Sequence, residues 1–145
     1  MGVEVSLQKQ RDLFTGRFRK VKTLKSKENL EQEALFQWIT LHESVYPGIG
    51  EAFHVPNGGY RRPREAEALK RRGVKAGEPD IYLLIPRRGF HGCAIELKTD
   101  HGRVSREQVY RLATLTSRGY FAVSCRGWEA ARDTLVGYLA LESSA

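Results

Sequence analysis

The alternation of apolar runs and turn residues near the middle of the chain predicts a β-hairpin. Residues 80–85 and 93–97 are short runs rich in apolar and β-branched side chains, as is typical of strands. The segment Pro86-Arg87-Arg88-Gly89 between them has the composition of a turn. With the centre of that turn near residue 88, antiparallel pairing places Asp80 opposite Glu96.

This pairing brings two carboxylates together on one face of the hairpin. Cβ atoms of directly opposed residues lie about 4.5–5.5 Å apart, so the two negative charges repel each other unless something neutralises them. A divalent cation removes the repulsion and prefers carboxylate oxygens as ligands. Lys98 follows Glu96 by two residues and therefore projects from the same face. One face of one hairpin thus offers Asp, Glu and Lys together.

Before the hairpin, the pattern predicts a helix, a strand and a second, short helix. Ser26 is a candidate N-cap for a helix that continues to about His42. Residues 49–55 have the composition of a strand, and residues 64–72 that of a short helix ending at Gly73. The apolar residues on one arc of the first helix are Leu30, Ala34, Leu35, Trp38, Ile39 and Leu41.

After the hairpin, the pattern predicts a helix, a strand and a closing helix. Ser105 and Gln108 have the spacing of a capping box at the start of a helix over residues 106–118. Residues 120–125 are continuously apolar and are expected to form a central strand, and residues 128–141 form an amphipathic helix. This order of elements predicts a small α/β fold with a mixed β-sheet flanked by helices.

The composition indicates a single domain without a membrane segment. A length of 145 residues allows one sizeable core, and we expect a basic N-terminal arm (residues 1–25) followed by one domain (residues 26–145). No apolar run approaches the about 20 residues of a membrane span, and a signal-peptide core is missing, so a cytoplasmic or nucleoid location is expected. Cys93 and Cys125 lie in apolar runs without CxxC spacing, which favours buried free thiols over a disulfide or a metal pair.

The positive charge of the chain is clustered. The formal net charge is +7. Residues 9–27 hold eight Lys/Arg and one acid, and residues 61–75 hold seven Lys/Arg and two acids. Such clusters suit a phosphate backbone, although a solvated basic surface has the same composition. The candidates for phosphate contacts are Arg61, Arg62, Arg64 and Lys70, together with the Asn57-Gly58 turn, where glycine lets a phosphate approach the backbone. Zinc-type spacing, a Ser-His-Asp order and a P-loop are all missing from the sequence, so no nucleotide cofactor is expected.

The hairpin residues also resemble a known signature. Pro79-Asp80 followed by Glu96-Leu97-Lys98 resembles the motif of the PD-(D/E)XK nuclease superfamily. The resemblance covers residues 33–122 and implies a restriction-endonuclease-like core, in which helices and strands surround a metal. The flanking elements are similar to those of the VRR-NUC branch: His54-Val55-Pro56-Asn57-Gly58-Gly59, Leu69-Lys70, Gly73, Gly77, and Gly102 through Ser105 with Gln108.

The resemblance assigns roles to individual residues. Asp80, Glu96 and the backbone carbonyl of Leu97 would hold Mg²⁺ or Mn²⁺, and Lys98 would orient the attacking water, accept its proton or offset charge in the transition state. Glu33 matches a first-helix glutamate that assists at the metal, directly or through water; the other interpretation is an exposed helix residue. Ser105 and Gln108 match residues beside the active site, where Gln108 would hold a water or a phosphate, and the capping box is the structural interpretation of the same pair. His54 and Glu78 are either substrate or metal contacts, or structural and exposed residues.

The combined pattern predicts a metal-dependent, structure-selective DNA endonuclease. Stand-alone members of this branch are associated with branched DNA such as four-way junctions, and the two-fold symmetry of a junction favours a homodimer. Leu13, Phe14, Phe18 and Phe90 are candidate apolar contacts between subunits. The alternative is a non-catalytic basic nucleic-acid-binding module, which has no need of paired carboxylates beside phosphates. A sequence-specific enzyme of the same fold is a weaker alternative, because no recognition domain is visible.

Overall fold

The computed structural model describes residues 19–57 and 61–143. Leu13, Phe14 and Phe18 of the N-terminal arm, and Gly58 of the predicted turn, lie outside the described residues. Among the described helices, none combines the length and apolar character that crossing a membrane requires. The elements are α2 (Arg19–His42), the 3₁₀ helix η1 (Ile49–Glu51), β1 (Phe53–His54), α3 (Pro63–Arg71), β2 (Ile81–Leu83), β3 (Cys93–Lys98), α4 (Arg106–Ser117), β4 (Phe121–Arg126) and α5 (Trp128–Leu139).

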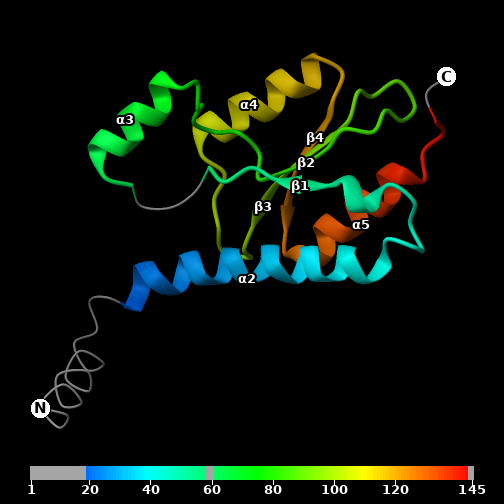
Figure 1. Ribbon diagram of the computed structural model, residues 1–145, viewed down its shortest axis with the longest axis horizontal. Coiled ribbons are helices and arrows are strands. Elements are labelled where there is room, and N and C mark those ends of the chain that lie inside the picture. The colour runs from blue at the N-terminus through cyan, green and yellow to red at the C-terminus, as the bar shows by residue number, and fades with distance from the viewer. Residues whose placement is uncertain (1–18, 58–60, 144–145) are drawn as a thin grey trace, which may run out of the picture.

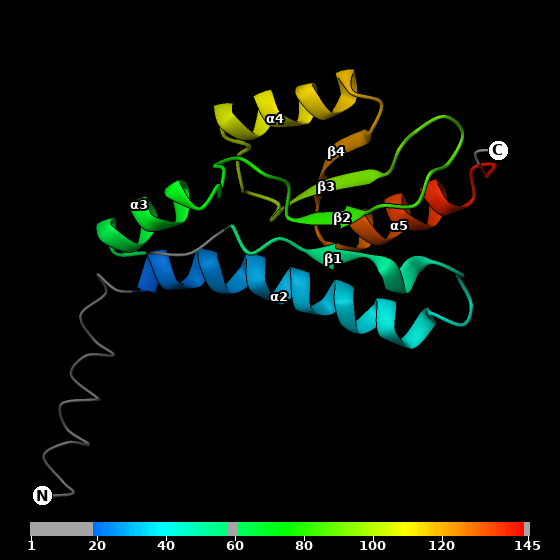
Figure 2. The same ribbon diagram turned by 45° about the horizontal axis from the view of Figure 1, so that its top comes forward.

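A four-stranded mixed sheet forms the centre of the fold. Its strand order is β1-β2-β3-β4, with antiparallel β1–β2 and β2–β3 pairs and a parallel β3–β4 pair. Helices α2 and α5 lie against one face and α4 lies against the other (Figures 1 and 2). All six residues of β3 are buried, as expected for a strand covered on both faces. The predicted α/β class with a mixed sheet is confirmed.

The hairpin has the predicted register. Ile81 pairs with Ile95, and Leu83 pairs with Cys93, so continuing this register by one residue beyond Ile81 brings Asp80 opposite Glu96. Arg88 and Gly89 both have positive φ at the turn, which centres it where the sequence predicts. Both cysteines are buried and free, as expected from their apolar surroundings.

Three elements differ from the sequence predictions. Helix α2 begins at Arg19 instead of Ser26, because the Arg and Lys residues before Ser26 are good helix formers. The expected strand over residues 49–55 is a 3₁₀ helix followed by a two-residue strand, since Gly48 enters this segment in the left-handed region. Strand β4 lies at the edge of the sheet instead of its centre. Its apolar side chains pack against α5 on one face and α4 on the other, which accounts for its apolar composition.

Phe90, predicted as a spare subunit contact, packs into the core of its own chain. Its ring lies edge-on to Phe121 at 5.5 Å between centroids and also contacts Tyr138. Phe90 is thereby used within the fold, and the structure offers no support for it as a dimer contact.

Candidate active site

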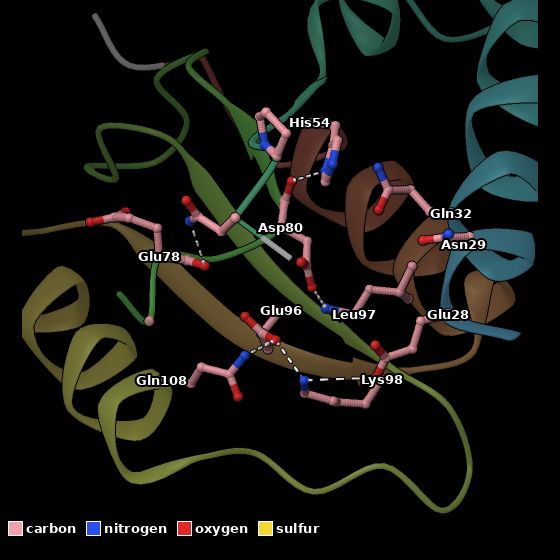
Figure 3. A pocket seen from close by; sticks show the side chains of 13 residues that line it. Glu28, Asn29, Gln32, His54, Glu78, Asp80, Glu96, Leu97, Lys98 and Gln108 are labelled. Carbon is pink, nitrogen blue, oxygen red and sulfur yellow. Dashed lines mark hydrogen bonds and ion pairs between the residues drawn. The ribbon is translucent and has the colours of Figure 1, made fainter. Parts of the chain in front are cut away.

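The predicted hairpin residues line a cavity of about 330 Å³ at one end of the sheet (Figure 3). Five segments meet there: α2, the end of β1, the loop before β2, the end of β3 and the start of α4. The side chains of Asp80, Glu96 and Lys98 point toward this space, and Gln108 faces them from α4 (Figure 3). The cavity is lined by Glu28, Asn29, Gln32, His54, Pro56, Asn57, Gly77, Glu78, Asp80, Glu96, Leu97, Lys98 and Gln108.

Backbone hydrogen bonds hold Asp80 in place. Its carbonyl oxygen accepts from the amide of Val55 at 2.8 Å and from Nδ1 of His54 at 2.9 Å. Its carboxylate oxygen Oδ2 accepts from the amide of Leu97 at 2.8 Å. Pro79, immediately before it, is fully buried. His54 therefore fixes Asp80 and also lines the cavity, which combines both interpretations of this histidine.

Glu96 is the central buried charge of the cavity. Its residue is only 1% exposed. Oxygen Oε1 lies 2.9 Å from Nζ of Lys98 and accepts a hydrogen bond from the amide of Gln108. Oxygen Oε2 is buried and has no hydrogen-bond partner among the described residues. Burial raises the pKa of Glu96 to about 7, the negative charge of Asp80 adds to the rise, and the ammonium of Lys98 opposes it.

Glu96→Gln should therefore stabilise the protein at pH 8 in the absence of divalent ions. The pKa of Glu96 is higher in the fold than its value of 4.5 in a free chain, so its contribution to stability is complete below pH 4.5 and is lost as the pH rises through about 7. At pH 8 we expect the free energy of unfolding of the variant to exceed that of wild type by on the order of 1–2 kcal/mol. The difference stays this small because the variant also loses the ion pair with Lys98. Urea unfolding in EDTA at pH 5 and pH 8 measures this gap; a variant less stable than wild type at pH 8 contradicts it.

Gln108 is held by the capping box at the start of α4. Its side-chain oxygen accepts from the amide of Ser105 at 2.8 Å, and the hydroxyl of Ser105 accepts from the amide of Gln108 at 3.2 Å. The box leaves the side-chain nitrogen of Gln108 aimed at Glu96. The two interpretations of this pair are thus compatible, because the cap orients the amide that binds the carboxylate.

Lys98 is nearly enclosed at the end of β3. The residue is 9% exposed, and its Nζ lies 3.9 Å from Oε1 of Glu28 on α2. The backbone of Gly102 passes so close that an added Cβ would lie 3.3 Å from Cδ of Lys98. The loop after β3 therefore confines the lysine beside Glu96.

The loop before β2 is fastened on both sides. Its Glu78 carbonyl accepts from Nδ2 of Asn57 at 3.2 Å. The Glu78 carboxylate forms an ion pair with Arg111 of α4 and accepts from the hydroxyl of Tyr82. Glu78 lines the cavity, but its two oxygens are engaged by these neighbours, which favours a structural role.

The remaining predicted site residues lie around the cavity rather than in it. Glu33 is exposed and lines a shallow neighbouring hollow with Asn29, Gln32, Phe36 and His54. Arg61 donates to the carbonyl of Pro56 at 2.9 Å. Exposed basic residues at the N-cap and along α3 are Arg62, Arg64 and Lys70, and Ser105 is exposed at the N-cap of α4.

Sequence reasoning missed three cavity residues on α2: Glu28, Asn29 and Gln32. The buried residues Leu35 and Ile39 mark the inward face of α2. Stepping back from Leu35 by three and then four positions gives Gln32 and Glu28 on the same face. These three residues could have been predicted from their helical spacing to the buried residues, since polar side chains on the inward face of a helix indicate a site.

Comparisons with known proteins identify the family of the chain. The family model of the VRR-NUC domain matches residues 26–129. A solved structure described as a "VRR_NUC domain protein" is similar, with a TM-score of 0.69 and 28% sequence identity over 80% of this chain and 90% of that chain. The comparison with curated proteins gave no match. Because the family model covers well over half of the chain and the fold agrees, the chain belongs to the VRR-NUC family of the PD-(D/E)XK nuclease superfamily.

Proposed function

We propose that this protein is a divalent-metal-dependent DNA endonuclease whose active site is the cavity around Asp80, Glu96 and Lys98. The observation that carries the proposal is the Glu96 carboxylate, of which one oxygen is held by Lys98 and Gln108 and the other is buried without a partner among the described residues. A buried charged oxygen without a partner is costly. A cation beside it removes that cost and the repulsion from Asp80.

The donor set fits Mg²⁺ or Mn²⁺. Within the described residues no group of three or more His, Cys, Asp or Glu side chains is placed to hold a metal, but Mg²⁺ keeps several waters and needs few protein ligands. The Leu97 carbonyl is a third hard donor beside the two carboxylates. In the continued hairpin register Leu97 faces Pro79, which has no N–H to donate to it.

Each residue of the cavity is assigned a separate role in hydrolysis. Asp80, Glu96 and the carbonyl of Leu97 would hold the ion, which would supply polarisation of the phosphodiester and a lower pKa of a bound water. Lys98, 2.9 Å from Glu96, orients the attacking water, accepts its proton or offsets charge in the transition state. Gln108 donates to Oε1 of Glu96 and thereby restrains the orientation of this carboxylate. We assign Glu33 an assisting role through water, and Glu28, which lies 3.9 Å from Lys98, is the second acidic residue of α2 available for it.

The basic residues around α3 are proposed to bind the DNA backbone. Helix α3 lies at the same end of the molecule as the N-terminal ends of α2 and α4 (Figures 1 and 2). Arg62, Arg64 and Lys70 are exposed there, while Asn57, Gly58, Arg61 and Ser105 are assigned to the same interface. Exposed cations beside the cavity provide the charge that a phosphate backbone requires.

Loss of the α3 cations should make DNA binding less dependent on salt. Each phosphate contact contributes about −0.9 to the slope of log K against log salt, so Arg62→Ala combined with Arg64→Ala should reduce the magnitude of the slope by about 1.8. Arg118→Ala, at the far end of α4, is the matched control and should leave the slope unchanged. Fluorescence anisotropy over a series of salt concentrations, from about 50 to about 300 mM, measures the slopes. Equal slopes for wild type and the double variant would place the DNA elsewhere.

Branched DNA, such as a four-way junction, is the proposed substrate, and a homodimer is the proposed assembly. A cleavage assay with Mg²⁺ or Mn²⁺ on single-stranded, duplex, flap and four-way DNA tests the activity and ranks the substrates. Binding without cleavage of any of them would support the alternative, a non-catalytic nucleic-acid-binding module. Light scattering on the full chain measures the assembly.

A further inference from the structure

We propose that a second hollow beside the active-site cavity binds one unpaired nucleotide of the substrate strand. The ring of Tyr110 would stack on the base, and Lys75 and Arg106 would contact the adjoining phosphates. This inference rests on the proposed DNA cleavage, because it describes how the strand approaches the active site.

The hollow lies between the loop before β2 and the first turns of α4. Its volume is about 540 Å³, with Lys75, Ala76 and Glu78 on one wall and Arg106, Tyr110 and Arg111 on the other. Glu78 lines both this hollow and the active-site cavity. The two spaces are therefore adjacent, and a strand with one phosphate in the cavity can extend a nearby nucleotide into the hollow.

Tyr110 provides an open aromatic surface. Tyr110 is 76% exposed, and its ring contacts no other aromatic ring among the described residues. Exposed aromatic side chains beside cations are the arrangement on which proteins stack the bases of single strands. Tyr110 lies in α4 two residues after Gln108, so the helix fixes the position of its backbone relative to the active-site cavity.

The charges of the hollow favour a phosphate. Arg111 is already paired with Glu78, so these two charges offset each other. Lys75 and Arg106 form no ion pair within the described part of the chain. Glu107 also lines the hollow, and its carboxylate leaves one positive charge in excess. The aromatic ring and the two free cations together match the base and the backbone of a nucleotide.

An unpaired nucleotide suits the hollow better than a duplex does. Its volume lies in the range of sites that enclose one small ligand, about 300–1,000 Å³. A base within a double helix has both faces covered by its neighbours, whereas an unpaired base offers a free face. Branch points and strand ends supply such bases, which links this hollow to selectivity for DNA structure.

Binding in EDTA tests the inference without any requirement for cleavage. Using fluorescence anisotropy, the full chain is titrated against labelled oligothymidylate and against a blunt duplex. Tyr110→Ala should weaken binding to the single strand about 5- to 100-fold, while Tyr110→Phe should stay within about twofold of wild type because a phenyl ring also stacks. Binding to the duplex should be unchanged by either variant.

Val109→Ala is the matched control. Val109 is the neighbouring exposed apolar residue of α4, 56% exposed, and it does not line the hollow. The inference is overturned if Tyr110→Ala binds the single strand like wild type, if Val109→Ala loses as much affinity, or if duplex binding falls equally. If Tyr110→Ala behaves as expected but wild type cleaves no DNA, only the nuclease proposal fails. If wild type cleaves DNA but Tyr110→Ala binds the single strand normally, only the proposed nucleotide site is rejected.

Discussion

Asp80→Asn and Glu96→Gln should each lower the rate of DNA cleavage on the order of 1000-fold. Both substitutions keep the size of the side chain and remove one anionic oxygen donor from the cavity. A metal ion contributes several kcal/mol to phosphoryl transfer, and each 1.36 kcal/mol corresponds to a factor of ten in rate. Loss of either carboxylate should therefore remove most of the acceleration.

Folding must be separated from chemistry in this experiment. Because Glu96→Gln should raise the stability of the metal-free protein, unfolding cannot explain its loss of activity. Mn²⁺ should raise the thermal midpoint of wild type by binding the native state, and this rise should disappear in both variants. Glu51→Gln, at an exposed carboxylate in η1, serves as the control for charge. Near-normal cleavage by either cavity variant would remove the metal-site assignment.

The hairpin was predictable because two local signals agree. The turn residues centre the loop near residue 88, and the period of two along each strand then fixes which side chains share a face. The observed pairs Ile81–Ile95 and Leu83–Cys93 follow from that register. The contact between Lys98 and Glu96 at 2.9 Å is a direct consequence.

The position of α2 could not be read from its own residues. The sequence pattern places Leu30 and Leu41 on the apolar arc, but they are 61% and 77% exposed. Only the narrower stripe through Leu35 and Ile39 meets the sheet. Which polar residues of α2 reach the cavity depends on where the helix crosses the sheet. That placement is set by tertiary contacts with α5 and β3, which no local pattern encodes.

The prediction of a central position for β4 is wrong for a related reason. Helices contact β4 from both faces. Its first three residues are half-buried and Cys125 is buried, although the strand lacks a second neighbouring strand. Apolar composition therefore reports the layers above and below a strand and not its place in the sheet. Strand β1 lies at the other edge of the sheet. Unlike the apolar residues of β4, both of its residues are exposed.

Lys98→Met should reduce turnover by about 100- to 1000-fold while Mn²⁺ binding is retained. Loss of one group that stabilises developing charge costs a factor of this size in other enzymes. Methionine keeps much of the length of the lysine stem, so packing against Gly102 and β3 should persist. Because Lys98 lowers the pKa of Glu96, the substitution raises that pKa further above about 7, and the measurements belong near pH 8.5.

Calorimetry and single-turnover cleavage together decide the role of Lys98. Removing a positive charge from beside the proposed ion should leave Mn²⁺ affinity equal or higher at pH 8.5, since the high pH favours the ionised form of Glu96. Lys98→Arg is the control that keeps the charge but changes its geometry, and it should recover only part of the rate if the lysine must meet the attacking water. If Lys98→Met no longer binds Mn²⁺ at this pH, the lysine instead holds the two carboxylates in place, and its assignment to the reaction is wrong.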